Sequence, residues 1–98
     1  MKLSDIWRRA DKELRQVRGS YGNAALKTAC ATGAIAYYMS NGRTCSPWRL
    51  TITELGETGG LCFDFQIRTA NRHTINELND NDCWTFIQFA EEAGRHGL

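Results

Sequence analysis

The chain has 98 residues, of which 42% are hydrophobic and 23% charged, and its formal net charge is +1. This composition is typical of one globular domain, residues 1–98, and excludes a disordered chain. The longest apolar stretch, residues 29–39, is too short to span a bilayer, and the charged N-terminal segment lacks the apolar core of a secretory signal. We therefore expect a cytoplasmic protein without membrane contact, and the small net charge argues against a nucleic-acid partner.

The first predicted element is an amphipathic helix that begins near Leu3 and continues to Val17, with Ser4 as its N-cap and Gly19 just past its end. Three basic side chains fall on one face of this helix: Arg8, Lys12 and Arg15. Acidic residues interleave with the basic ones at four-residue spacing, which is typical of a solvated helix surface. We expect the three basic residues to be exposed and available to an acidic partner.

A second helix is predicted over residues 24–40, with Asn23 as its cap. This helix is nearly all apolar, so we expect other elements to cover it on most sides. Gly33 lacks a side chain and lets a neighbouring element approach the helix backbone closely. Tyr37 and Tyr38 lie at the C-terminal end of the predicted helix.

An antiparallel β-hairpin is predicted after the second helix. From Trp48 to residue 52 apolar and polar residues alternate, and the alternation resumes over residues 61–67 after the glycine-rich segment 56–60. Two alternating runs that flank a glycine-rich turn are typical of a hairpin. A two-stranded hairpin alone is marginally stable, so its apolar face should pack on the helices.

The C-terminal part of the chain predicts two helical segments. Thr74 and Glu77 form a capping box, which indicates a short helical turn that ends at Asn79. A final helix is predicted to follow at once, with Asp82 as its N-cap and Gly94 as its end. Its predicted buried side carries Cys83, Phe86, Ile87 and Ala90. The predicted fold class is α+β, in the order α-α-β-β-α-α, with the hairpin packed on the helices around a central apolar helix.

The cysteines are spread along the chain, at Cys30, Cys45, Cys62 and Cys83. Structural metal sites usually bring two ligands within a few residues of each other, and no two of these cysteines are that close. In the cytoplasm we expect all of them to stay reduced. The sequence predicts neither a metal site nor a cofactor.

Cysteine catalysis is an alternative hypothesis. A cysteine nucleophile needs a base and an orienting group, and Cys30, His73 and Asn79 form the conceivable set. Cys30 is predicted about two turns inside the second helix, where apolar surroundings raise the pKa of a thiol. We therefore assign no catalytic residue. The alternative hypothesis is a small-molecule-binding domain or a cysteine-dependent enzyme, with these residues near the wall of a pocket between hairpin and central helix.

Two segments carry a resemblance to a known group of domains. Residues 30–35 read Cys-Ala-Thr-Gly-Ala-Ile inside an apolar helix, and residues 75–80 end in Asn79-Asp80 before the last helix. Together they resemble small uncharacterised domains of actinobacteria and their phages, which share a Cys-x-x-Gly-Ala helix and a late Asn-Asp helix start. The resemblance implies no known activity. The residues themselves indicate architecture, with Gly33 at a close contact and Asn79 fixing the chain before the final helix.

Large aromatic residues are more numerous than so small a core easily hides, and Trp and Tyr anchor many protein interfaces. We therefore expect a non-enzymatic protein-interaction module and, in the narrowest form of this hypothesis, a phage-encoded inhibitor that binds a host defence protein. The predicted partner-binding residues are Tyr37, Tyr38, Trp48, Arg8, Lys12 and Arg15. Self-association is a further alternative, because a basic first helix and an acidic last helix could pair between chains.

Overall fold

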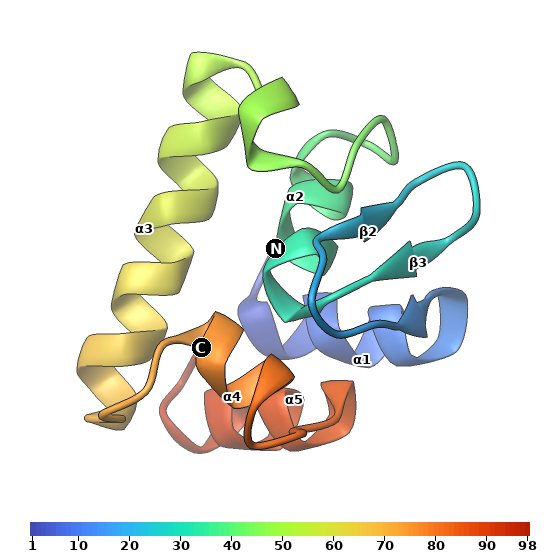
Figure 1. Cartoon of the computed structure of the whole chain (residues 1–98). Helices are drawn as coiled ribbons and strands as arrows, with labels where there is room; N and C mark the ends of the chain where they lie inside the picture. The colour runs from blue at the N-terminus through green and yellow to red at the C-terminus, as the bar shows by residue number, and fades with distance from the viewer.

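The computed structural model describes residues 1–98 and combines five α-helices with a 3-10 turn and a small three-stranded sheet (Figure 1). The elements follow in the order α1 (Leu3–Glu13), β1 (Arg15–Gln16), β2 (Gly22–Asn23), β3 (Thr28–Ala29), α2 (Ala31–Met39), the 3-10 turn (Pro47–Arg49), α3 (Ile52–Thr69), α4 (Ile75–Asp80) and α5 (Phe86–Arg95). The fold is thus mixed α and β, as predicted, but it is mostly helical and its strands lie elsewhere than predicted. None of the helices has the length and apolar content needed to cross a membrane.

The core forms where α1 packs along α5, beneath α2 (Figure 1). Trp7 of α1 is fully buried, and its ring centroid lies 5.2 Å from that of Phe65 and 4.9 Å from that of Phe89. The indole N–H of Trp7 donates a hydrogen bond of 3.0 Å to the backbone oxygen of Ala31, at the start of α2. One tryptophan therefore joins α1 to three other helices, and its polar group has a partner as burial requires.

The first helix is shorter than predicted. It ends at Glu13, and Leu14 is extended, because the chain then enters β1, where Arg15 pairs with Thr28 of β3 in parallel register. Ser4 is not the N-cap, since the cap position is Lys2; the Ser4 hydroxyl instead donates to the backbone oxygen of Leu98 at 3.4 Å.

The second predicted helix, over residues 24–40, is wrong in its first half. β2 and β3 form an antiparallel hairpin there, and α2 begins only at Ala31. Gly22 has a φ of +107°, and an added Cβ would overlap the backbone of Thr28, so only glycine fits this position. Asn23 bends the chain through its side-chain oxygen, which accepts a hydrogen bond from the N–H of Leu26 at 3.2 Å.

The close contact predicted at Gly33 is confirmed. Gly33 lies on the buried side of α2, and a Cβ at this position would collide with the backbone oxygen of Tyr21. The same oxygen accepts a hydrogen bond of 3.2 Å from the N–H of Cys30. Gly33 therefore lets the connection between β1 and β2 lie directly on α2.

The hairpin predicted over residues 48–68 is also wrong, because α3 occupies this segment. Thr51 and Glu54 form a capping box that starts the helix, and the buried side of α3 carries Thr58 and Phe65, two turns apart. The alternating apolar residues that predicted strands lie on two sides of α3. Those on the outward side are not covered by any other element. α3 forms one edge of the molecule (Figure 1).

The capping box at Thr74 is confirmed, and α4 follows it. The cap of α5 is Thr85, which forms a capping box with Gln88, and not Asp82. Two residues that were expected on the buried side of the last helix are exposed: Cys83, which precedes the helix with a φ of +55°, and Ile87.

Candidate protein-binding groove

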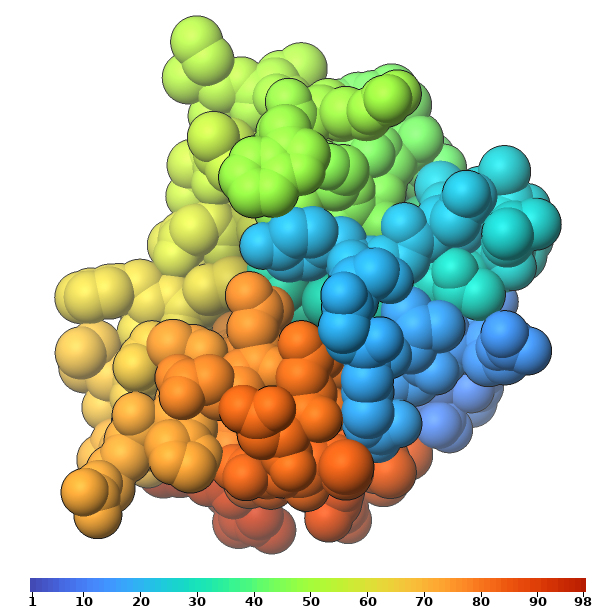
Figure 2. Space-filling view, in the orientation of Figure 1, coloured from blue at the N-terminus to red at the C-terminus, as the bar shows by residue number.

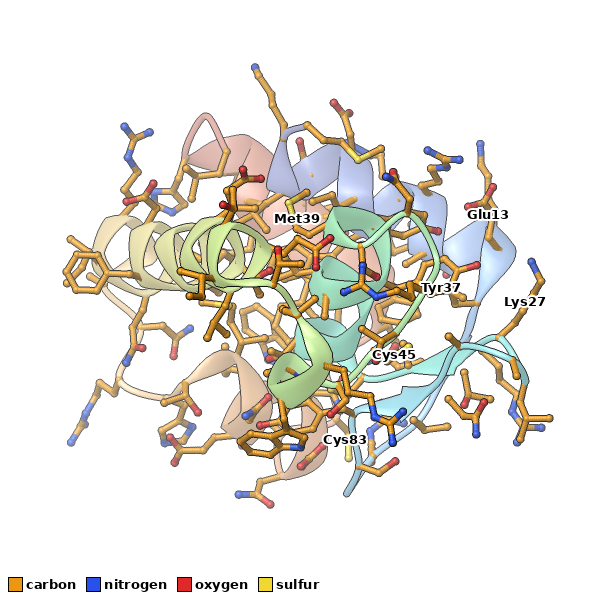
Figure 3. All side chains as sticks on the ribbon, turned by 90° about the horizontal axis from the view of Figure 1, so that it is seen from above. Glu13, Lys27, Tyr37, Met39, Cys45 and Cys83 are labelled. Atoms are coloured by element: carbon orange, nitrogen blue, oxygen red, sulfur yellow. The ribbon has the colours of Figure 1, made fainter.

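A groove of about 680 Å³ lies at the C-terminal ends of α1 and α2. Its lining consists of Arg9, Glu13, Lys27, Tyr37, Tyr38 and Met39, together with Met1, Asn41 and Gly42. We call it the tyrosine groove. Figure 3 shows Glu13, Lys27 and Tyr37 on the same side of the molecule, although they come from three different segments of the chain.

The end of α2 brings the two tyrosines to the surface. The first turns of the helix are buried, whereas Tyr37 and Tyr38 in its last turn are half-buried. Asn41 and Gly42 then reverse the chain with φ values of +54° and +80°, and the N–H of Gly42 donates to the Tyr37 backbone oxygen at 2.7 Å. The groove thus combines a helix end with a tight reversal that keeps its tyrosines in place.

Three side chains form a polar network in the groove. The Tyr38 hydroxyl donates a hydrogen bond of 2.7 Å to Oε1 of Glu13, and Nε of Arg9 donates to the same oxygen at 3.0 Å. The guanidinium of Arg9 lies 5.1 Å from the centroid of the Tyr38 ring. The Tyr37 ring packs edge-on against Tyr38, with centroids 5.1 Å apart. These contacts hold the four side chains in one arrangement without a ligand.

The network shifts the pKa values of Glu13 and Tyr38 away from neutral pH. The hydrogen bond from Tyr38 and the charge of Arg9 lower the pKa of Glu13 below its usual value. Partial burial and the bond to Glu13 raise the pKa of Tyr38 well above its ordinary value. At neutral pH Glu13 is consequently a carboxylate and Tyr38 a neutral phenol. General acid–base catalysis works best with a pKa near the working pH, so this pair is better suited to binding than to proton transfer.

Lys27 lines the groove and forms no ion pair, and two further basic residues without ion-pair partners, Lys12 and Arg15, lie close to Glu13 in the sequence. Lys12 is in the last turn of α1, and the N–H of Arg15 donates to the backbone oxygen of Lys27 at 2.8 Å. Arg8 lies apart from them, within about 4 Å of the position that a Cβ on Gly94 of α5 would take. The prediction that Arg8, Lys12 and Arg15 share one helix face is therefore wrong, because Arg15 lies in β1.

Trp48 lies on a different surface. It is 79% exposed in the 3-10 turn before α3, and its ring packs edge-on against Tyr21 with centroids 5.8 Å apart. Figure 2 shows this turn, in green, beside the blue segment around residue 20. Trp48 does not line the tyrosine groove with Tyr37 and Tyr38, so the predicted partner-binding aromatic residues do not form one surface.

A smaller cavity of about 210 Å³ lies beside Cys30 and is also lined by Tyr21, Asn76 and Asp80. Cys30 is the N-cap of α2, not a residue two turns inside it, and its sulfur accepts a hydrogen bond from the N–H of Gly33 at 3.2 Å. Burial nevertheless raises the pKa of the Cys30 thiol. His73 does not line this cavity; its Nδ1 lies 2.7 Å from a carboxylate oxygen of Asp82.

Asn79, the third residue of the alternative site, is fully buried and hydrogen-bonded throughout. Its side-chain oxygen accepts from the N–H of Ala31 at 3.0 Å and from Gln16 at 2.7 Å, and its amide nitrogen donates to the Val17 backbone oxygen at 3.0 Å and to Asp80 at 2.7 Å. Asn79 thus ties α4 to β1 and to the start of α2. No capacity is left for a ligand.

The two segments that carry the family resemblance meet at this hydrogen bond between Asn79 and Ala31. No family model, curated protein or solved structure matches the chain. The resemblance therefore stays a prediction. No three histidine, cysteine or acidic side chains gather closely enough to hold a metal ion.

Of the residues that line the tyrosine groove, the sequence identified only Tyr37 and Tyr38, and it missed all three charged ones, Arg9, Glu13 and Lys27. Arg9 and Glu13 have the four-residue spacing of an ordinary surface ion pair, and nothing in the sequence shows that Tyr38 joins them. Lys27 was placed inside a helix, whereas it lies in the hairpin turn with a φ of +54°. The local signal for that turn is Asn23, whose side-chain oxygen accepts a hydrogen bond from the N–H of Leu26.

Proposed function

We propose that the protein is a non-enzymatic interaction module and that its tyrosine groove binds an acidic segment of a partner protein. The observation that carries the proposal is the network of Arg9, Glu13 and Tyr38 in a groove that also contains the unpaired Lys27. Side chains that are already ordered lose little conformational entropy on binding, which favours affinity.

The chemistry of the lining supports a protein ligand. Tyr and Met are enriched at protein interfaces, and Tyr37, Tyr38 and Met39 follow one another at the end of α2. Lys27 of the groove and the neighbouring Lys12 have no ion-pair partner within the chain. Positive charge at the edge of a binding surface attracts an acidic partner and increases the rate of association.

The competing enzyme or small-molecule hypothesis would use the cavity beside Cys30. At about 210 Å³ this cavity is smaller than the roughly 300–1,000 Å³ of ordinary ligand pockets. The Cys30 thiol has no histidine beside it, and its raised pKa disfavours the thiolate that a nucleophile needs. The tyrosine groove is therefore the better candidate.

We further propose that the protein acts in the cytoplasm. All four cysteines are free thiols, as a reducing cytoplasm would keep them. The group that the sequence resembles occurs in actinobacteria and their phages, so the narrowest form of the proposal remains a phage-encoded inhibitor of a host defence protein.

The test is affinity capture from an actinobacterial lysate on the immobilised wild-type chain and on two charge-reversal variants. Lys27→Glu changes the groove, and Arg72→Glu makes the same charge change at an exposed residue outside it. We expect one protein to bind wild type and Arg72→Glu but not Lys27→Glu, and to elute as salt is raised.

The captured protein is then purified and titrated by calorimetry. Lys27→Glu and Tyr37→Ala should each weaken its affinity by about tenfold or more, which corresponds to ~1.4 kcal/mol. Equal affinity for all variants, or no protein retained above a blank resin, would contradict the proposal.

A further inference from the structure

The outward side of α3 carries an apolar stripe that no part of the chain covers. The stripe consists of Ile52, Gly56, Gly59, Gly60, Phe63 and Ile67, which we call the α3 stripe. At 100° per residue these positions fall within about one third of the helix circumference, opposite the buried Thr58 and Phe65. Ile52 is 92% exposed, Phe63 65% and Ile67 62%. No charged residue interrupts the stripe.

The glycines of the α3 stripe have no role within the chain itself. A Cβ added at Gly56, Gly59 or Gly60 would meet no atom within 4 Å. Glycine is nonetheless one of the least favourable residues in the interior of a helix. If the only requirement were a stable α3, alanine at each of these positions would increase the stability of the helix. The glycines are explained if the backbone of a second helix approaches α3 closely.

The stripe is symmetric about its centre. A two-fold axis between Gly59 and Gly60 relates Ile52 to Ile67 and Gly56 to Phe63. If two α3 helices pack antiparallel about this axis, each Phe63 ring lies on the bare backbone of Gly56 in the other copy. We propose that two copies of the chain form a symmetric dimer through their α3 stripes in this antiparallel register.

A second copy fits the stripe better than an unrelated protein. A symmetric interface requires a surface that is complementary to itself, and the paired large and small residues provide this. Antiparallel packing also brings the N-terminal end of each helix near the C-terminal end of the other, so the helix dipoles attract. The core of such an interface is depleted of charge, as the stripe is.

The available area is sufficient for a stable dimer. A fully exposed aromatic side chain presents roughly 150–250 Å², so Phe63 alone exposes over 100 Å². If the exposed surface of both isoleucines, the three glycines and the neighbouring Leu55 is also buried, each chain contributes on the order of 600 Å². Two chains would then bury roughly 1,200 Å², the lower end of the range for specific interfaces.

The dimer and the tyrosine groove are independent. α3 forms one edge of the molecule, and the groove lies at the C-terminal ends of α1 and α2 (Figure 1). A dimer would therefore present two open grooves. Failure of partner capture would leave the dimer proposal intact, and a monomeric protein would leave the groove proposal intact.

The first test is sedimentation velocity of the full chain over a range of concentrations. We expect wild type to dimerise at roughly 10–100 μM, as suits an interface of the smallest specific size. Phe63→Glu and Gly60→Leu should each weaken the dimer at least tenfold while leaving the folded chain unchanged by circular dichroism. Leu26→Glu, which places the same charge at another exposed apolar residue, should dimerise like wild type.

Two outcomes of that experiment would overturn the proposal. One is a wild-type chain that stays monomeric up to about 1 mM, and the other is a Phe63→Glu variant that dimerises like wild type. Salt provides a third readout, because an apolar interface withstands high salt whereas pairing of oppositely charged helices does not. A dimer that dissociates as salt is raised would therefore also contradict association through the stripe.

The second test determines the register by disulfide trapping in a Cys83→Ser background, which removes the exposed native thiol. The thiols introduced by Gly60→Cys lie next to the two-fold axis and should be oxidised to an intermolecular disulfide by diamide, which is reduced as the bond forms. Those introduced by Ile67→Cys lie far apart in the antiparallel dimer and should not. Equal trapping at both positions would indicate parallel packing and overturn the proposed register.

Discussion

The side-chain oxygen of Asn79 accepts a hydrogen bond of 3.0 Å from the backbone N–H of Ala31, which fixes the start of α2 to α4. Asn79→Ala would leave this buried N–H and the Val17 carbonyl without partners. At about 1–3 kcal/mol for each unsatisfied group, we expect the free energy of unfolding in urea to fall by about 3 kcal/mol or more. Asn81→Ala, at an exposed neighbouring position, is the control and should change it by less than about 0.5 kcal/mol. Equal effects would show that the Asn79 network is not structural.

Any side chain introduced at Gly33 should cause a severe packing defect. A Cβ there would collide with the Tyr21 backbone oxygen, which cannot rotate away as a side chain can. Gly33→Ala should therefore destabilise the fold by more than the ~1–3 kcal/mol of ordinary overpacking, and Gly33→Leu should unfold it. Gly94→Ala in α5 has room for the methyl group and should stabilise by about 0.5–1 kcal/mol. Thermal denaturation of the three variants checks the order.

Replacing Thr58 by valine should increase the stability of the protein. The Thr58 hydroxyl is buried on the inner side of α3 and has no hydrogen-bond partner. Thr58→Val replaces the hydroxyl by a methyl group of similar size, and we expect a gain of about 1 kcal/mol in unfolding free energy, seen as a midpoint higher by several degrees. Thr58→Ser, which keeps the hydroxyl and removes the methyl group, should lose stability. A Thr58→Val variant less stable than wild type would show that the hydroxyl is satisfied.

The contact between His73 and Asp82 predicts a pH dependence. The carboxylate, 2.7 Å from Nδ1, raises the pKa of His73 above its ordinary value. The folded state thus binds the proton more tightly than the unfolded state. The resulting stabilisation is fully present below the unfolded pKa of about 6.5 and is lost as pH rises through the higher folded pKa. An NMR titration of the His73 ring should show the raised pKa, and Asp82→Asn should return it toward the unfolded value.

The environments of the cysteines predict their order of reaction. Burial raises the pKa of Cys45 and of Cys62 to about 11 and also raises that of Cys30, whereas Cys83 is exposed. A thiol-specific reagent at pH 7.5 should therefore label Cys83 first and the other thiols slowly. Mass spectrometry of the labelled peptides gives the order. Labelling of Cys30 faster than free cysteine would revive the enzyme hypothesis.

The sequence predicted elements well where a local signal and the burial pattern agreed. The capping box at Thr74 and the close contact at Gly33 are confirmed by the structure. An equivalent box at Thr51 and Glu54 marks the start of α3, but the apolar alternation after it favoured strands. That alternation arises because α3 has apolar residues on two sides, one against the core and one exposed. Periodicity alone cannot separate these two sides from the two faces of a strand.

The candidate site depends on contacts between distant parts of the chain. Tyr37 and Tyr38 could be chosen from their chemistry, but their partners Arg9 and Glu13 come from another helix. The helix predicted over residues 24–30 shows the same limit. A run such as Ala24-Ala25-Leu26 is favourable in a helix, and the tertiary contact of Gly22 with Thr28 overrides that preference.

The position of Trp7 between Phe65 and Phe89 has a consequence for how the chain folds. The aromatic core cannot close until segments from opposite ends of the chain meet, so the rate of folding should depend on long-range encounter more than on helix formation. Once it has closed, α1 and α5 hold each other in a cooperative unit. α3 buries only Thr58 and Phe65 among its 18 residues, so local opening of the fold should begin at this helix.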